Sequence, residues 1–393
     1  MGLNETPSAE RVHIGFFGVR NAGKSSVVNR ITNQELSIVS EVKGTTTDAV
    51  KKPMELLPIG AVVIIDTAGI DDEGELGRMR VKSTEKVLEQ CDLAVFVTQS
   101  RGELLESEKD LLELIKARRI PFVVARNKSD VFGFGENSDT EVFVSAKENK
   151  GFEELKNALG KLAGAEKKEI RFVADFLNEN DIAVLVTPID ASAPKGRLIL
   201  PQQQAIRDII DLGASALVTQ PEQLTAVLES LNKPPALVIT DSQAFSKVMK
   251  LVPEEIPLTS FSILMARYKG FLDAAVKGAE TLDSLEDGAR VLIAEGCTHH
   301  RQCEDIGTVK LPKWLREYTG KELELEFTSG HGFPDDLSGY DLIIHCGACM
   351  LGDAEVKSRM LKASAQGVPF TNYGTVIAAI NGILQRSIQI IYK

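Results

Sequence analysis

The stretch "GVRNAGKS", Gly18 to Ser25, decides the fold of the first part of this chain. It follows the apolar run "HIGFF" (13–17) and precedes the helical pattern "SVVNRIT" (26–32). This is the motif G-x-x-x-x-G-K-[ST] in the strand–loop–helix setting that the motif requires. The glycines let successive backbone N–H groups curl around phosphates, and the helix N-terminus adds positive potential. We therefore expect a phosphate-binding loop in which Lys24 reaches the β- and γ-phosphates and Ser25 ligates Mg²⁺.

Short apolar runs alternate with amphipathic stretches over the first 165 residues. The amphipathic stretches lie at 77–90, 105–118 and 151–163. The apolar runs are "VHIGFFG", "AVVIIDTAG", "DLAVFV", "PFVVARNK" and "EVFVSAK". This alternation predicts an α/β fold with a mostly parallel sheet covered by helices. The charged run "GAEKKEIR" (164–171) is typical of a domain boundary.

Two further blocks show the same alternation. The middle block has apolar runs in "DIAVLVTPID", "GASALVTQP" and "PALVITD", with helical patterns at 201–212, 221–231 and 241–250. The last block has strands predicted at 288–296 and 340–347, and helices at 353–366 and 374–386. We expect three α/β domains: a P-loop domain over 1–168, a second domain over 169–260 and a third over 261–393.

A second group of motifs selects the base of the nucleotide. "NKSD", Asn127 to Asp130, follows the strand "PFVVAR", and the Asp130 carboxylate can accept two hydrogen bonds from the guanine ring edge, where adenine offers no such pair. "SAK" (145–147) follows the next strand, where it is expected to close over the base. The residues expected to contact the nucleotide are Gly18, Asn21, Ala22, Gly23, Lys24, Ser25, Ser26, Asn127, Lys128, Asp130, Ser145, Ala146 and Lys147.

Two more motifs complete the set. "DTAG", Asp66 to Gly69, ends the strand "AVVII", and "GTTTD" (44–48) lies in a polar loop before it. Five motifs in this order and at this spacing indicate a GTPase that binds GTP with Mg²⁺. The catalytic residues are expected to be Lys24, Thr46, Asp66 and Gly69, and the Mg²⁺ ligands Ser25 and Thr46.

Composition narrows the class of protein. A net charge of −11 and a pI of about 5.2 argue against binding along a nucleic-acid backbone, which needs a basic face. No apolar run approaches the length that spans a bilayer, and the N-terminal sequence lacks the layout of a signal peptide. We expect a cytoplasmic protein that binds neither nucleic acid nor membrane. Five cysteines in that compartment favour metal or redox chemistry over structural disulfides, apart from an isolated, buried Cys91.

The other four cysteines lie in two short segments. "GCTHHRQC" (296–303) and "HCGAC" (345–349) each follow a predicted strand, and the ends of neighbouring parallel strands meet at one edge of a sheet. Cys297, Cys346 and Cys349 can therefore converge as three metal ligands. Spacing alone does not separate a 4Fe–4S cluster from a zinc site, and it leaves the role of Cys303 open.

The first domain resembles the potassium-activated tRNA-modification GTPases and their relatives. The resemblance rests on Asn21 in the phosphate loop, on "GTTTD", and on Ile70, which stands where Ras-like GTPases have a glutamine. It implies that Asn21 helps to hold a K⁺ ion that replaces an arginine finger, and that intrinsic turnover is slow.

The chain as a whole resembles the iron–iron hydrogenase maturation GTPases, the HydF family. The resemblance rests on the three-block layout and on the C-terminal pattern Cys297-Thr-His299 … His345-Cys346-Gly-Ala-Cys349. It implies a 4Fe–4S cluster held by the three cysteines, with His299 or His345 as candidate fourth ligand. It also implies a scaffold that carries a diiron precursor from radical-SAM maturation enzymes to apo-hydrogenase. GTP hydrolysis would switch partner association, and the middle domain would form a homodimer or higher oligomer.

Two other hypotheses stay open. A tRNA- or ribosome-directed GTPase would hold a structural zinc at the C-terminal cysteines. A redox sensor would use the same cysteines to gate GTP hydrolysis.

Overall fold

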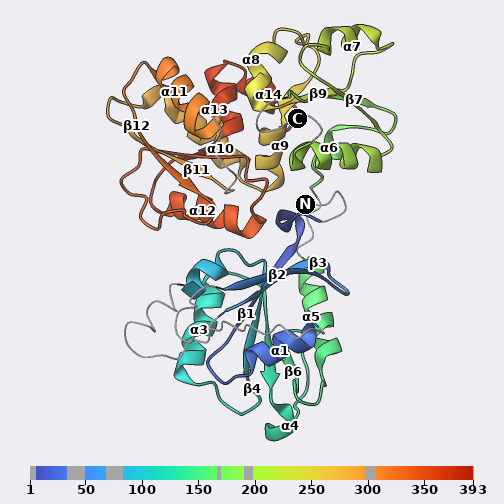
Figure 1. Cartoon of the computed structure of the whole chain (residues 1–393), viewed down its shortest axis with the longest axis vertical. Coiled ribbons are helices and arrows are strands. Elements are labelled where there is room, and N and C mark those ends of the chain that lie inside the picture. The colour runs from blue at the N-terminus through green and yellow to red at the C-terminus, as the bar shows by residue number, and fades with distance from the viewer. Residues whose placement is uncertain are drawn as a thin grey trace. The chain divides into compact units, whose positions relative to one another are not determined.

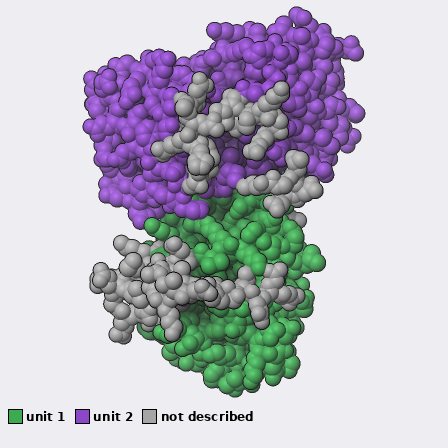
Figure 2. Space-filling view, in the orientation of Figure 1, with its two compact units in different colours: residues 1–167, 352–355 green, residues 168–351, 356–393 purple. Residues whose placement is uncertain are grey.

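A computed structural model describes residues 6–32, 49–67, 83–165, 170–189, 198–296 and 306–392. It contains three sheets, and the chain divides into two compact units (Figure 2). Residues 1–167 with 352–355 form the first unit, and residues 168–351 with 356–393 form the second. No helix in the described part of the chain is long and apolar enough to cross a membrane.

The first unit is built on a six-stranded sheet with the order β2-β3-β1-β4-β5-β6 (Figure 1). All neighbouring strands run parallel except β2 and β3, so the predicted α/β fold with a mostly parallel sheet is confirmed. The strands are β1 (Val12–Phe17), β2 (Val50–Leu56), β3 (Gly60–Asp66), β4 (Leu93–Gln99), β5 (Phe122–Asn127) and β6 (Glu141–Phe143).

Helices cover both faces of this sheet. On one face, α1 (Lys24–Ile31) and α5 (Phe152–Ala165) bury apolar residues such as Val28 and Leu155 against the strands. On the other face, α3 (Glu106–Ala117) buries Leu111 and Ile115. Both faces of the parallel strands are therefore buried, which explains their unbroken apolar sequences.

Gly15 in β1 marks a place where the core leaves no room for a side chain. A β-carbon there would lie 2.5 Å from both Cys91 Sγ and the Phe17 ring. Cys91 is buried, as predicted, and its thiol donates to the Val87 carbonyl at 3.1 Å. Burial raises the pKa of this thiol well above its ordinary value.

We expect Gly15→Ala to lower the free energy of unfolding of the first unit by about 1–3 kcal/mol because the added methyl overpacks this contact. Urea unfolding would measure the loss. Gly164→Ala is the matched control, because a β-carbon on Gly164 in α5 meets nothing within 4 Å. Equal effects of the two substitutions would show that the crowding at Gly15 is not real.

The second unit holds two four-stranded parallel sheets (Figure 1). The first has the order β10-β9-β7-β8, and its strands are β7 (Ile182–Val186), β8 (Ser215–Thr219), β9 (Leu237–Thr240) and β10 (Leu258–Ser260). The second has the order β12-β11-β13-β14, and its strands are β11 (Arg290–Glu295), β12 (Glu324–Ser329), β13 (Leu342–His345) and β14 (Phe370–Asn372).

The helices of this unit connect its strands. Those of the middle region are α6 (Leu200–Asp211), α7 (Leu224–Ser230), α8 (Phe245–Val248) and α9 (Phe261–Tyr268). Those of the last region are α10 (Leu272–Glu280), α11 (Leu311–Thr319), α12 (Asp353–Ala365), α13 (Tyr373–Ile380) and α14 (Leu384–Ile388). The single helix predicted over 374–386 is wrong: the chain breaks it into α13 and α14 at Gly382, whose φ of 70° lies in the left-handed region.

One hydrophobic cluster contains residues from both four-stranded sheets of the second unit. Buried Val184 of β7 and Phe245 of α8 belong to the same cluster as Val291 of β11 and Ile344 of β13. The two sheets of the second unit therefore share one buried cluster, and the first of them also has a separate cluster that includes Leu185, Leu237 and Leu264.

Candidate functional site

The predicted phosphate loop lies between β1 and α1, where the sequence placed it. Gly23 has a φ of 86°, and a β-carbon there would collide with the Asn127 amide nitrogen. Gly18 is equally confined, because a β-carbon on it would collide with the Val97 carbonyl oxygen. Each glycine of the motif is thus required by a close approach of another segment.

Lys24 and Asp66 meet beside this loop. Asp66 ends β3, the neighbour of β1, and its Oδ1 accepts a hydrogen bond from Lys24 Nζ at 2.5 Å. Both side chains are buried, and Ser25 Oγ lies 3.5 Å from the other carboxylate oxygen. Three of the predicted catalytic and Mg²⁺ residues therefore gather at one edge of the sheet. A buried cation next to a carboxylate and a hydroxyl is a suitable setting for a phosphate and its metal ion.

Asn127 joins the three nucleotide motifs. Its amide nitrogen donates to the Ala22 carbonyl of the phosphate loop at 3.0 Å, and its amide oxygen accepts from the Ala146 backbone N–H at 3.1 Å. Ser145 Oγ in turn donates to Asp130 Oδ1 at 2.8 Å. These bonds hold "NKSD" and "SAK" together beside the phosphate loop, although Asp130 and Ser145 are 15 residues apart in the sequence.

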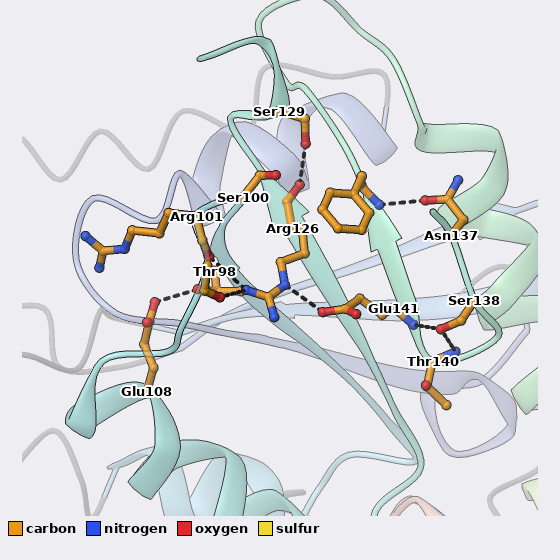
Figure 3. Close-up of polar contacts among 12 residues, drawn as sticks. Thr98, Ser100, Arg101, Glu108, Arg126, Ser129, Asn137, Ser138, Thr140 and Glu141 are labelled. Carbon is orange, nitrogen blue, oxygen red and sulfur yellow. Dashed lines mark hydrogen bonds and ion pairs between the residues drawn. The ribbon is translucent and has the colours of Figure 1, made fainter. Parts of the chain in front are cut away.

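Figure 3 shows a network of polar contacts around Arg126, the residue before the NKSD motif. Arg126, which directly precedes Asn127, donates from Nε to Glu141 at 2.6 Å and from Nη1 to the Arg101 carbonyl at 3.1 Å. Thr98 at the end of β4 donates to buried Glu108 at 2.6 Å. Sequence reasoning missed these residues, because their partners come from β6, from α3 and from the loop after β4, and no motif contains them.

Some predicted nucleotide residues cannot be placed. Thr46 and Gly69, with Ile70, lie outside the described residues. Asn21 is described: its φ is 63°, and its backbone carbonyl accepts from Gln99 Nε2 at 3.2 Å.

The cysteine site lies where β11 and β13 end. These strands pair in parallel, with Ala294 opposite His345, so the expected adjacency of the two strand ends is confirmed. Cys346 Sγ accepts a hydrogen bond from the Gly296 N–H at 3.0 Å and another from the Ala348 N–H at 3.4 Å. Ala348 has a φ of 57°, which turns the chain sharply between Cys346 and Cys349. Backbone N–H groups aimed at a cysteine sulfur are the donors that stabilise a thiolate or a metal-bound sulfur.

Two buried, positively charged side chains, Arg359 and Lys269, lie near the two thiols. Burial is the main cause that raises the pKa of Cys346, and it raises the pKa of Cys349 to about 11. The Arg359 guanidinium opposes this shift at Cys346, and the Lys269 ammonium opposes it at Cys349. Arg359 and Lys269 are only 4% and 3% exposed. The buried Glu295 carboxyl acts in the opposite direction and raises the pKa of Cys346.

Each of these cations is held in place by the protein. Lys269 Nζ donates to the Leu351 carbonyl at 2.6 Å. Arg359 Nη2 donates to the Gly330 carbonyl at 2.5 Å, and its guanidinium lies 5.2 Å from the centre of the Phe333 ring. Sequence reasoning missed both residues, since neither lies in the cysteine motifs.

His345 is buried, and both of its ring nitrogens have partners. Nε2 lies 3.0 Å from Arg359 Nη1, and Nδ1 lies 2.9 Å from the Cys346 carbonyl oxygen. Because a guanidinium only donates, Nε2 is the acceptor, and Nδ1 carries the proton that it donates to the carbonyl. His345 thus orients the cysteine loop, and it would have to give up the Arg359 bond to ligate a metal.

The remaining residues of this pattern, Cys297, His299 and Cys303, lie outside the described residues. Among the residues that are described, no group of three His, Cys, Asp or Glu side chains is arranged to hold a metal ion. Cys297 follows Gly296 directly in the sequence, and the Gly296 N–H contacts the Cys346 sulfur.

Family comparisons match three parts of the chain. Residues 13–128 match the family described as 50S ribosome-binding GTPase. Residues 172–270 match the hydrogen maturase F dimerization domain, and residues 273–390 match the hydrogen maturase F tetramerization domain. The chain belongs to the hydrogen maturase F family. Both regions of the second unit carry the hydrogen maturase F description, whereas the first unit matches a GTPase domain that other families share.

Curated relatives resemble only part of this hydrogen maturase F chain. A tRNA modification GTPase MnmE from Cytophaga hutchinsonii is 36% identical over 151 residues, which cover 36% of this chain and 32% of the relative. A second MnmE, from Dechloromonas aromatica, is 30% identical over 169 residues, or 42% of this chain and 37% of the relative. The chain thus spans about a third of the length of these curated relatives, 32% and 37%. Among solved structures, a probable GTP-binding protein engB is 20% identical and covers 39% of this chain and 100% of its own, with a TM-score of 0.32.

Proposed function

We propose that this chain is a GTP hydrolase that serves as a scaffold and carrier in the maturation of iron–iron hydrogenase. The observation that carries the proposal is the pair of hydrogen maturase F domains, over 172–270 and 273–390, that follow a GTPase domain in one chain. The cysteine site in the second of these domains supports it.

In the nucleotide half, the residues of the five motifs would bind and orient GTP. Lys24, which contacts Asp66 here, would reach the phosphates, and Ser25 and Thr46 would hold a Mg²⁺ ion near Asp66. Asp130, oriented by Ser145, accepts hydrogen bonds from the guanine edge. Gly69, which lies outside the described residues, would offer its N–H to the γ-phosphate. GTP hydrolysis then switches the association of the chain with its partners.

In the cysteine half, Cys297, Cys346 and Cys349 would hold a 4Fe–4S cluster. The fit rests on the two backbone N–H donors at the Cys346 sulfur. When bound, such a cluster has one iron without a cysteine ligand, which is open to exchange. Because both ring nitrogens of His345 have partners, His299 is the better of the two candidate fourth ligands.

The cargo and the partners follow from the same proposal. Radical-SAM maturation enzymes would supply a diiron precursor, and apo-hydrogenase would receive it. The dimerization and tetramerization domains support a homo-oligomer as the working form. We place this work in the cytoplasm, where cysteines stay reduced and available to iron.

The first test is the metal content of protein purified without oxygen. We expect about four irons and four sulfides per chain, with an EPR signal from the cluster after reduction. Stoichiometric zinc, with no iron even after anaerobic reconstitution, would overturn the scaffold. It would favour a tRNA- or ribosome-directed GTPase with a structural zinc, in line with the tRNA modification GTPases that resemble part of the chain.

A separate prediction concerns potassium. We propose that Asn21 helps to hold a K⁺ ion at the phosphates, so the rate of GTP hydrolysis should rise when K⁺ replaces Na⁺. Asn21→Ala should remove the difference between the two salts. Phosphate release at equal ionic strength measures both rates. If wild-type protein works equally fast in both salts, Asn21 has no such role.

A further inference from the structure

The hydroxyl of Ser262 lies against the cysteine loop although it belongs to a different part of the chain. Ser262 is the second residue of α9, a helix that Ser260 caps by accepting from the Ile263 N–H at 3.2 Å. The Ser262 backbone carbonyl accepts a hydrogen bond from Asn372 Nδ2 at 3.0 Å. Asn372 ends β14, which pairs with β13. The start of α9 is thus fixed at the sheet edge from which Cys346 follows.

Two glycines leave the space in which this hydroxyl lies. A β-carbon on Gly347, between the two cysteines, would lie 3.3 Å from Ser262 Oγ. A β-carbon on Gly374 in α13 would lie 3.0 Å from Oγ and 2.8 Å from the Ser262 β-carbon. Neither glycine has a positive φ. Glycine is therefore needed at these positions for space, and not for an unusual backbone conformation. The Ser262 side chain is therefore enclosed by the cysteine loop and α13.

Ser262 Oγ is buried and has no hydrogen-bond partner in the described part of the chain. A buried hydroxyl without a partner destabilises a folded protein, and such groups are rare unless a ligand or ion completes them. Of the two segments that enclose this hydroxyl, the one with Gly347 carries both cysteines. The missing acceptor is therefore expected on that side.

We propose that the Ser262 hydroxyl is part of the cysteine site and donates a hydrogen bond to a sulfur atom of the iron–sulfur cluster held there. The inference rests on the proposed function, because the acceptor is the cluster itself. Sulfide and thiolate sulfurs carry negative charge and accept such bonds, and a hydrogen bond to a cluster sulfur stabilises the reduced, more negative state. Ser262 is a positioning and tuning residue from outside the cysteine motifs, and it does not ligate iron.

The experiment compares Ser262→Ala with wild type in the full chain, reconstituted anaerobically with iron and sulfide. We expect Ser262→Ala to keep its iron and sulfide but to shift the midpoint potential of the cluster to a more negative value, measured by EPR-monitored redox titration. The metal-free variant should melt at or above the wild-type temperature, because it loses a hydroxyl that had no partner. Ser387→Ala is the control: buried Ser387 already donates to the Ile383 carbonyl at 2.8 Å, so its removal should leave the potential unchanged.

The outcomes separate this inference from the proposed function. An unchanged potential in loaded Ser262→Ala would overturn the inference and leave the scaffold intact. A lower melting temperature of metal-free Ser262→Ala would also overturn it, because the hydroxyl would then have a partner within the protein. Failure of wild-type protein to take up iron would overturn the scaffold itself, and with it the proposed acceptor.

Discussion

Replacing Cys346 with serine should abolish iron–sulfur loading and hydrogenase activation while GTP hydrolysis stays close to the wild-type rate. Cys346 Sγ accepts hydrogen bonds from the Gly296 and Ala348 N–H groups. These bonds would stabilise its thiolate as an iron ligand. A serine hydroxyl is a much poorer ligand for iron than a thiolate. The GTPase motifs lie in the other compact unit, which does not contain residue 346. Iron analysis, activation of apo-hydrogenase and phosphate release measure the three properties.

Cys91→Ala serves as the matched control for this substitution. Cys91 is a buried thiol of the first unit, so its loss should leave the iron content unchanged. A collapse of GTP hydrolysis in Cys346→Ser would contradict the idea that the two activities are separable. Full iron content in that variant would remove Cys346 from the site.

Replacing Asp130 with asparagine should change the preferred base from guanine to xanthine. The carboxylate accepts two hydrogen bonds from guanine, whereas the amide of asparagine presents one donor and one acceptor. Xanthine carries a carbonyl oxygen where guanine carries its amino group, and it can accept from that donor. Affinity for GTP should fall by at least about 100-fold, since sites built to hydrogen-bond a substrate discriminate by about 10⁴–10⁵-fold. Affinity for xanthosine triphosphate should rise.

Hydrolysis of the two nucleotides over a range of concentrations would show the exchange. Turnover of xanthosine triphosphate by Asp130→Asn proves that the variant is folded, because a damaged protein would lose both substrates. Ser145→Ala is an informative comparison: it removes the 2.8 Å bond to Asp130 and should weaken GTP binding without changing the preferred base. Unchanged GTP binding by Asp130→Asn would mean that Asp130 does not contact guanine.

The nucleotide half of the site could be predicted because each of its motifs is a short, contiguous segment. The glycines of 18–25 and the sequence Asn127 to Asp130 carry their chemistry in local spacing. The link between those motifs is not local. Asn127, at the end of β5, bonds both Ala22 and Ala146, and this depends on how the fold brings the three segments together.

The surroundings of the cysteines could not be predicted for the same reason. Arg359 lies on α12, and Lys269 and Ser262 come from the segment that includes α9. As isolated residues in helical patterns they have no distinguishing sequence context. The strands β10 and β14 were also missed, because three-residue strands give too little pattern to identify. Antiparallel β2 was missed because Lys51, Lys52 and Pro53 interrupt its apolar character.

The core shared by the two sheets of the second unit has a consequence for how this protein can be divided. A fragment that starts at residue 273, where the tetramerization domain is matched, would lack Ser262 and Lys269. It would also lack Val184 and Phe245, which belong to the same buried cluster as Val291 and Ile344. Residues 168–351 and 356–393 should therefore unfold together in one cooperative transition. We therefore expect a working cluster carrier to need both halves of this unit.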